Sequence, residues 1–155
     1  MKSEVNVEEI DPGIDRPAGP RRPVRHHGPV LGVVAVGGGL GTLARYGISR
    51  LLPAAPDGFP WATFLINVLG CLLIGVLMVL VTEVYAAHRL VRPFLGVGVL
   101  GGFTTFSTYA LEIHELLRPG TIGVAFGYLA GTLVAAMLAV LAGTWLTRAL
   151  VGRPA

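Results

Sequence analysis

The sequence predicts an all-α integral membrane protein with four transmembrane helices. The chain of 155 residues is 53% hydrophobic and only 14% charged, whereas soluble domains carry roughly 25% charged residues. Its mean hydropathy is +0.69. Four long apolar runs follow residue 29, and short polar or proline-containing stretches separate them. The single cysteine, Cys71, excludes a disulfide framework and a paired-cysteine metal site.

The first 28 residues mix acidic, basic and proline residues without a periodic apolar face. This composition is typical of a disordered tail. The stretch is too long for a secretory signal, and no clean small-residue cleavage site follows it. We therefore expect a retained, disordered cytoplasmic tail over 1–28 and a membrane domain over 29–150.

The four predicted spans cover about residues 30–52, 61–82, 93–117 and 121–147. The second apolar run, from Trp61 to Val81, contains twenty-one residues, which reach about 31 Å as a helix and so cross the hydrocarbon core. Pro93 opens the third span, at the position where a helix tolerates proline. The chain is thus expected to cross the membrane four times.

The third span carries a dense polar segment, Gly-Gly-Phe-Thr-Thr-Phe-Ser-Thr-Tyr-Ala-Leu-Glu, over residues 101–112. Its hydroxyl groups would each cost several kcal/mol in hydrocarbon if they were left unsatisfied, so they must line a polar feature. Each glycine of the pair Gly101-Gly102 weakens a helix by roughly 1 kcal/mol. We therefore expect the third helix to be broken near Gly101-Gly102, with backbone carbonyl groups freed there.

Glycines recur at four-residue spacing in three spans, a pattern that lets helix backbones approach closely in lipid. The fourth span has Gly123, Gly127 and Gly131, and the pairs Gly37/Gly41 and Gly98/Gly102 repeat the spacing elsewhere. Four short helices enclose little of a polar path, so we expect an oligomer. Packing within a single chain is the alternative, because the spacing does not say which partner each face meets.

Other function classes find little support in the sequence. The segments 39–44 and 96–101 fit glycine-rich dinucleotide-binding patterns, but such a motif needs a strand before it and a helix after it. No nucleophile stands beside a base and no metalloprotease or phosphate-loop motif is present, so we expect no enzyme. The basic residues flank apolar runs, which favours a lipid bilayer over nucleic acid as the partner.

Polar groups recur on shared helix faces within the spans. Asn67 follows Thr63 by four residues, and Tyr109 follows Phe106 by three. Each offers a hydrogen-bond donor or the positive edge of a ring, and no cation stands in mid-membrane. Such a set is suited to an anion path, because donors and ring edges replace water without trapping the ion. Asn67 joining two helices is the simpler alternative.

Three motifs in order resemble the CrcB/Fluc family of fluoride channels, and the resemblance covers about residues 31–148. They are Gly-Gly-Leu-Gly-Thr-Leu-Ala-Arg-Tyr at 38–46, Thr-Phe-Leu-Ile-Asn-Val-Leu-Gly at 63–70 and the polar segment at 101–112. The resemblance implies an antiparallel dual-topology dimer with two fluoride pores in the cell membrane. It also implies passive export of fluoride from the cytoplasm, which prevents toxic accumulation.

The resemblance also assigns site residues. Asn67, Phe106, Thr108, Tyr128 and Arg45 match pore or vestibule positions of the family. Tyr109 stands where the family has its second pore phenylalanine, so its added hydroxyl would donate to fluoride or narrow the path.

Thr63 and Ser107 complete the predicted fluoride pore. The carbonyl groups of Gly101 and Thr104 match positions that hold a central sodium ion between two subunits.

The arginines and the one lysine predict a preferred orientation. Nine lie on the side of the termini and three on the other, which by the positive-inside rule places both termini in the cytoplasm. The two sets are Lys2, Arg16, Arg21, Arg22, Arg25, Arg89, Arg92, Arg148 and Arg153 against Arg45, Arg50 and Arg118. This bias leaves two partners open, an identical chain or an oppositely oriented paralogue.

The alternative function is one half of a proton-coupled small-multidrug-type transporter, which also uses four short spans. That mechanism needs a membrane-embedded carboxylate, and the first span has none.

Overall fold

Four helical segments make up the described part of the chain. The computed structural model describes residues 28–55, 57–84 and 89–152, so the tail predicted over 1–28 lies almost entirely outside the described residues. All four segments are long and apolar enough to cross a membrane, which confirms the prediction of four spans. The elements are α1 (Gly28–Leu51), α2 (Trp61–Val79), the π-helical η1 (Leu80–Val84) and η2 (Pro93–Leu100), α3 (Gly101–Phe103), α4 (Phe106–Leu116) and α5 (Ile122–Val151).

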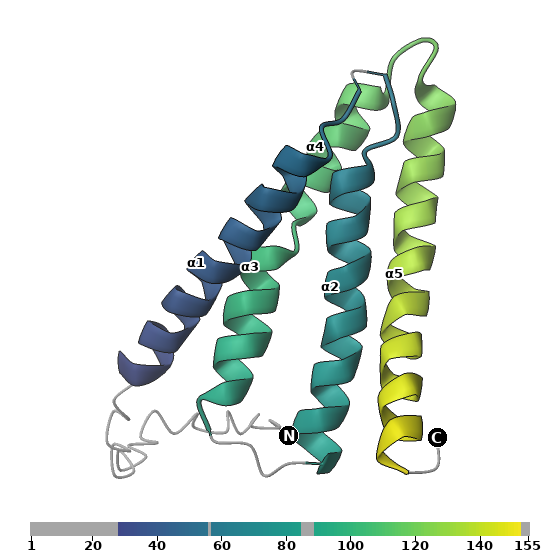
Figure 1. Cartoon of the computed structure of the whole chain (residues 1–155). Coiled ribbons are helices and arrows are strands. Elements are labelled where there is room, and N and C mark those ends of the chain that lie inside the picture. The colour runs from purple at the N-terminus through teal and green to yellow at the C-terminus, as the bar shows by residue number, and fades with distance from the viewer. Residues whose placement is uncertain (1–27, 56, 85–88, 153–155) are drawn as a thin grey trace, which may run out of the picture.

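The helices pack as two pairs (Figure 1). The first half of the third span lies along α1, and α2 lies along α5. The beginning of α1 and the end of α5 lie at the same end of the bundle, as an even number of crossings requires. The connection from α1 to α2 and the connection from α4 to α5 lie at the opposite end.

The third span is broken at Thr104 and Thr105, just after the glycine pair that predicted the break. Thr104 (φ −76°, ψ 157°) and Thr105 (φ −147°, ψ 124°) are extended, and α4 begins at Phe106. Gly101 and Gly102 are both helical and belong to α3. The glycines are therefore not the break itself, and Gly102 has a packing role instead.

Glycines let the first helix pair touch backbone to backbone. A Cβ atom on Gly102 would overlap the Gly38 carbonyl oxygen, and a Cβ atom on Gly41 would overlap the Val99 carbonyl oxygen. Only glycine fits at both positions, because backbone atoms cannot move aside as a side chain can. The predicted close approach of the Gly37/Gly41 and Gly98/Gly102 faces is thus found within one chain.

The second helix pair uses a reciprocal glycine contact. A Cβ atom on Gly75 of α2 would overlap the Val140 carbonyl oxygen, and one on Gly143 of α5 would overlap the Leu72 carbonyl oxygen. The predicted ladder of Gly123, Gly127 and Gly131 does not form this contact. Among the described residues, no atom lies within 4 Å of a Cβ added at any of these three glycines, so the described part of the chain leaves that face of α5 open.

We predict that Gly75→Ala lowers the free energy of unfolding by about 1–3 kcal/mol, because the added methyl group must displace the α5 backbone. The matched control is Gly32→Ala in α1, where an added Cβ atom meets no described atom within 4 Å. Both substitutions gain similar helix propensity, so the difference between them isolates the packing cost. Unfolding of the detergent-solubilised variants measures it, and equal stabilities would contradict the contact.

Candidate functional site

The broken third span is repaired by a side chain from α2. Asn67 Nδ2 donates to the Thr105 carbonyl oxygen over 3.0 Å, and the Thr105 backbone N–H donates to Asn67 Oδ1 over 2.9 Å. In a continuous helix the Thr105 N–H would bond to the Gly101 carbonyl oxygen, and the carboxamide replaces that hydrogen bond while also donating to the Thr105 carbonyl oxygen. An unpaired backbone group in hydrocarbon costs several kcal/mol, so this pairing holds the break open at low cost.

The Thr105 side chain caps the helix that follows the break. Its Oγ1 accepts from the Thr108 backbone N–H at 3.2 Å, which is the contact of an N-cap residue with the third residue of a helix. The same oxygen donates to Thr108 Oγ1 at 3.0 Å and lies 3.4 Å from Ser107 Oγ. Three of the predicted hydroxyl groups therefore form one network at the start of α4.

Gly70 completes the surface that α2 presents to the break. A Cβ atom on Gly70 would overlap the Thr104 methyl group, so glycine is what admits Thr104 against α2. Gly70 lies three residues after Asn67 and therefore on the same helix face. This face of α2 therefore accommodates the extended segment in two ways: Asn67 forms hydrogen bonds to it, and Gly70 leaves space for it.

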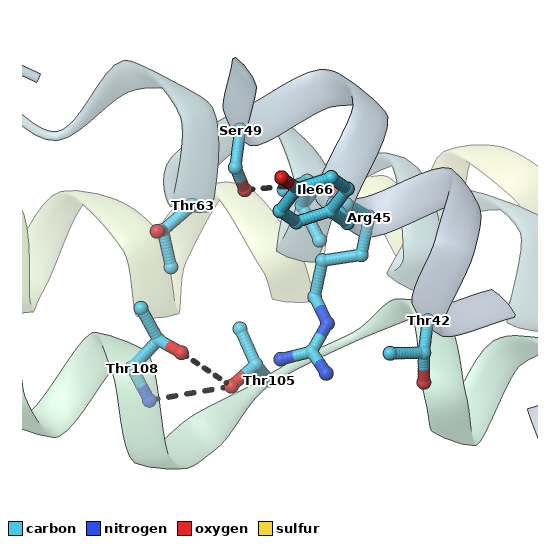
Figure 2. A pocket seen from close by; sticks show the side chains of 8 residues that line it. Thr42, Arg45, Ser49, Thr63, Ile66, Thr105 and Thr108 are labelled. Carbon is cyan, nitrogen blue, oxygen red and sulfur yellow. Dashed lines mark hydrogen bonds between the residues drawn. The ribbon is translucent and has the colours of Figure 1, made fainter. Parts of the chain in front are cut away.

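A pocket of about 190 Å³ lies on one side of the break (Figure 2). It is lined by residues of α1, α2 and the start of α4: Thr42, Arg45, Tyr46, Ser49, Thr63, Ile66, Thr105 and Thr108. We call this the arginine pocket. Figure 2 shows the Arg45 guanidinium extending toward Thr105, and Arg45 forms no ion pair with any described residue. The pocket therefore combines several hydroxyl groups with one uncompensated positive charge.

A second pocket of about 240 Å³ also includes Thr105 in its lining. We call this the phenylalanine pocket, and it is lined by Asn67, Cys71, Ile74, Thr104, Thr105, Phe106, Tyr109, Thr132, Leu133 and Ala136. The Thr132 hydroxyl is buried, with the residue 4% exposed, and has no hydrogen-bond partner among the described residues. An unsatisfied buried hydroxyl is a donor available to a ligand or water.

Phe106 and Tyr109 have different surroundings in this pocket. Phe106 is 78% exposed, whereas Tyr109 is buried, and the centroids of the two rings lie 6.0 Å apart. The Tyr109 hydroxyl donates to the Leu129 carbonyl oxygen of α5 over 2.8 Å. The group that distinguishes Tyr109 from phenylalanine is thus engaged within the chain.

Glu112 is a polar residue of this region that the sequence motifs did not single out as a site residue. Thr63 Oγ1 donates to Glu112 Oε1 at 2.8 Å, and the Tyr128 hydroxyl donates to Oε2 at 2.7 Å. Tyr128 is fully buried, and its ring packs edge-on against Tyr109 at 5.1 Å. Glu112 follows Thr108 by four residues, and this shared helix face was the available signal.

The predicted site residues divide into three groups. Asn67, Phe106, Tyr109 and Thr104 line the phenylalanine pocket, while Arg45, Thr63 and Thr108 line the arginine pocket. Tyr128, Ser107 and Gly101 line neither pocket. The predicted residues that line a pocket come from α1, α2 and the segment from Thr104 to Tyr109, and Thr105 lines both pockets. Their individual roles in conduction stay predictions.

The sequence matches known proteins over most of its described length. The family model described as "CrcB-like protein, Camphor Resistance (CrcB)" matches residues 32–144. "Fluoride-specific ion channel FluC 2" of Nocardia farcinica is 59% identical over 119 residues, which cover 77% of this chain and 85% of that protein.

Two further relatives carry similar names. "Fluoride-specific ion channel FluC 2" of Streptomyces avermitilis is 56% identical over 79% of each chain. "Fluoride-specific ion channel FluC" of Paracoccus denitrificans is 44% identical over 76% of this chain and 93% of that protein.

We predict that Tyr128→Phe lowers the free energy of unfolding by about 1.5–3 kcal/mol, because it removes a hydrogen bond to a carboxylate. Tyr109→Phe is the matched control, since it removes a hydrogen bond from a tyrosine to a neutral carbonyl group, worth about 0.5–1.5 kcal/mol. Thermal unfolding in detergent compares the two. Equal losses would show that the Glu112 contact is no stronger than the Leu129 contact.

Proposed function

This chain belongs to the CrcB family and is a fluoride-specific ion channel, and we propose that fluoride crosses it passively past the break in the third span. The observation that carries the proposal is that the arginine pocket and the phenylalanine pocket meet at Thr105. Thr105 thus belongs both to a pocket that holds a positive charge and to a pocket whose Thr132 hydroxyl has no partner among the described residues. The direction of net flow is set by the fluoride gradient, so the channel exports fluoride from a cell that has accumulated it.

The arginine pocket is suited to collect anions. Arg45 supplies a positive charge beside the hydroxyl groups of Thr42 and Ser49. A charge at a half-buried entrance raises the local anion concentration and does not bind the ion inside the path. Glu112 accepts hydrogen bonds from Thr63 and Tyr128 at its two oxygen atoms, so both oxygen atoms have partners within the chain.

The phenylalanine pocket is suited to replace the water around a small anion. Thr132 offers its free hydroxyl, and the second hydrogen atom of Asn67 Nδ2 remains after the bond to Thr105. Phe106 contributes the positive edge of its ring. Short donors and ring edges favour fluoride over chloride, because the larger ion cannot make the same close contacts.

A structural sodium ion fits the carbonyl groups that the resemblance assigned to it. In a continuous helix the N–H groups of Thr105 and Thr108 would bond to the carbonyl groups of Gly101 and Thr104. Here these N–H groups bond to Asn67 Oδ1 and Thr105 Oγ1 instead. The break therefore spares two hard oxygen ligands, the kind that a hard cation prefers. Bound there, the ion would stabilise the break between two subunits.

A second chain would cover surfaces that the single chain leaves open. The glycine ladder of α5 and the ring of Phe106 are both exposed within the membrane-spanning region. An antiparallel dimer brings two copies of each break together, with two pores. The excess of arginine on the side of the termini supports a preferred cytoplasmic location for both termini. The partner is an identical chain or an oppositely oriented paralogue.

Fluoride efflux tests the path through Thr132. The chain, purified alone and reconstituted in liposomes, is expected to release fluoride and retain chloride. We predict that Thr132→Val lowers fluoride efflux about tenfold or more, because a donor to an anion contributes about 1.5–3 kcal/mol. The variant should fold as well as the parent, since the Thr132 hydroxyl has no described partner to lose.

Thr144→Val is the matched control, because it removes a hydroxyl of the same helix that bonds to the Leu141 carbonyl oxygen. It should leave efflux unchanged. Equal efflux of chloride and fluoride would overturn selective conduction, and parental efflux in Thr132→Val would remove Thr132 from the path. Efflux only after a paralogue is added would exclude the homodimer.

Removal of sodium tests the proposed ion. With sodium replaced by N-methylglucamine on both sides of the membrane, we expect fluoride efflux to fall severalfold and to recover when sodium is returned. The large cation cannot fit between carbonyl groups. Efflux that is the same in either cation would show that no sodium site is needed.

A further inference from the structure

An apolar groove lies between the two helix pairs, away from both pockets of the candidate site. Its volume is about 240 Å³, and its lining is hydrocarbon from α2, η1 and η2. Leu73, Leu77 and Leu80 line one wall, and Leu95 and Val99 line the other. Leu73 to Leu80 rises about 10 Å along a helix axis, so the groove has the length of a chain segment and not of a single methyl group.

The groove follows from the packing of the two helix pairs. Gly98 of η2 lies against Gly37 of α1, and Gly75 of α2 lies against α5. Each pair is drawn together on its own side, so α2 and η2 make few contacts with each other. Figure 1 shows the first half of the third span, which precedes α3, beside α1 and apart from α2.

Two arginines stand at the end of the groove where η2 begins. Arg92 precedes Pro93 and lies one helical turn before Leu95, and Arg89 lies in the preceding turn. Both residues are exposed, and neither forms an ion pair with a described residue. The third arginine at this end, Arg148, is engaged by Glu83 at 2.7 Å. The end of the groove is therefore positively charged.

We propose that the groove binds one acyl chain of an anionic phospholipid whose phosphate group lies at Arg89 and Arg92. The walls offer no hydrogen-bond donor for an anion or a peptide backbone, and they lie in segments that span the membrane. Apolar walls that end in two arginines with no ion-pair partner among the described residues complement one class of molecule, a lipid with a hydrocarbon tail and a negative head. The site makes no contact with either pocket of the fluoride path.

Native mass spectrometry of the full chain tests this with phosphatidylglycerol and phosphatidylcholine of identical acyl chains. The parent protein is expected to retain phosphatidylglycerol preferentially. Each basic residue contributes about fivefold to binding an anionic lipid surface, so the double variant Arg89→Gln/Arg92→Gln should bind phosphatidylglycerol about 25-fold more weakly. Arg50→Gln, which removes an exposed arginine at the opposite end of α1, should bind it as the parent does.

Leu95→Trp fills the mouth of the groove and should reduce the binding of both lipids. The double arginine variant alters only exposed side chains, so it keeps the test valid if the tryptophan variant does not assemble. Glycerol phosphate, which has the head group without tails, should not compete. Three results would each overturn the proposal. The parent could bind the two lipids equally, or the double variant could bind phosphatidylglycerol as strongly as the parent does. Leu95→Trp could also change the oligomeric mass without losing lipid.

Discussion

The structure depends on one constraint, that every backbone polar group in hydrocarbon needs a partner. The third span leaves the helical conformation at Thr104 and Thr105, and Asn67 of the neighbouring helix bonds to the backbone N–H and carbonyl groups of Thr105. Because the partner is a side chain of α2, the break has a fixed place relative to that helix. The two pockets, the cap of α4 and the spared carbonyl groups are all positioned by this contact.

Glycine contacts determine where space is left around the break. Gly41 and Gly102 bring α1 and α3 together, while Gly75 and Gly143 bring α2 and α5 together. At these contacts backbone lies against backbone, with no side chain that could move aside, so the spacing within each pair is fixed there. The polar side chains of the site occupy one part of the space between the pairs, and the apolar groove occupies another.

The spans and most residues of the candidate site could be predicted from the sequence. The length of an apolar run, and the polar residues within that run, can both be recognised in a short stretch of sequence. The position of the break could not be predicted to the residue. Glycine weakens a helix and also permits close packing, and only the contact of Gly102 with Gly38 shows which effect applies. The contact between Glu112 and Thr63 could not be predicted for another reason. Thr63 is 49 positions away in the sequence, and only the fold brings the two residues together.

The contact between Asn67 and Thr105 also limits how the sequence can drift. At position 105 the bonds to Asn67 use the backbone alone, and any residue that caps a helix, such as serine or aspartate, would keep the start of α4. At position 67 one side chain must donate and accept at a fixed reach. Aspartate has no donor, glutamine is longer by one methylene group, and serine cannot make both bonds at once. Position 105 therefore tolerates more amino-acid types than position 67 does. The stricter sequence requirement lies in α2, the unbroken helix, and not in the broken third span.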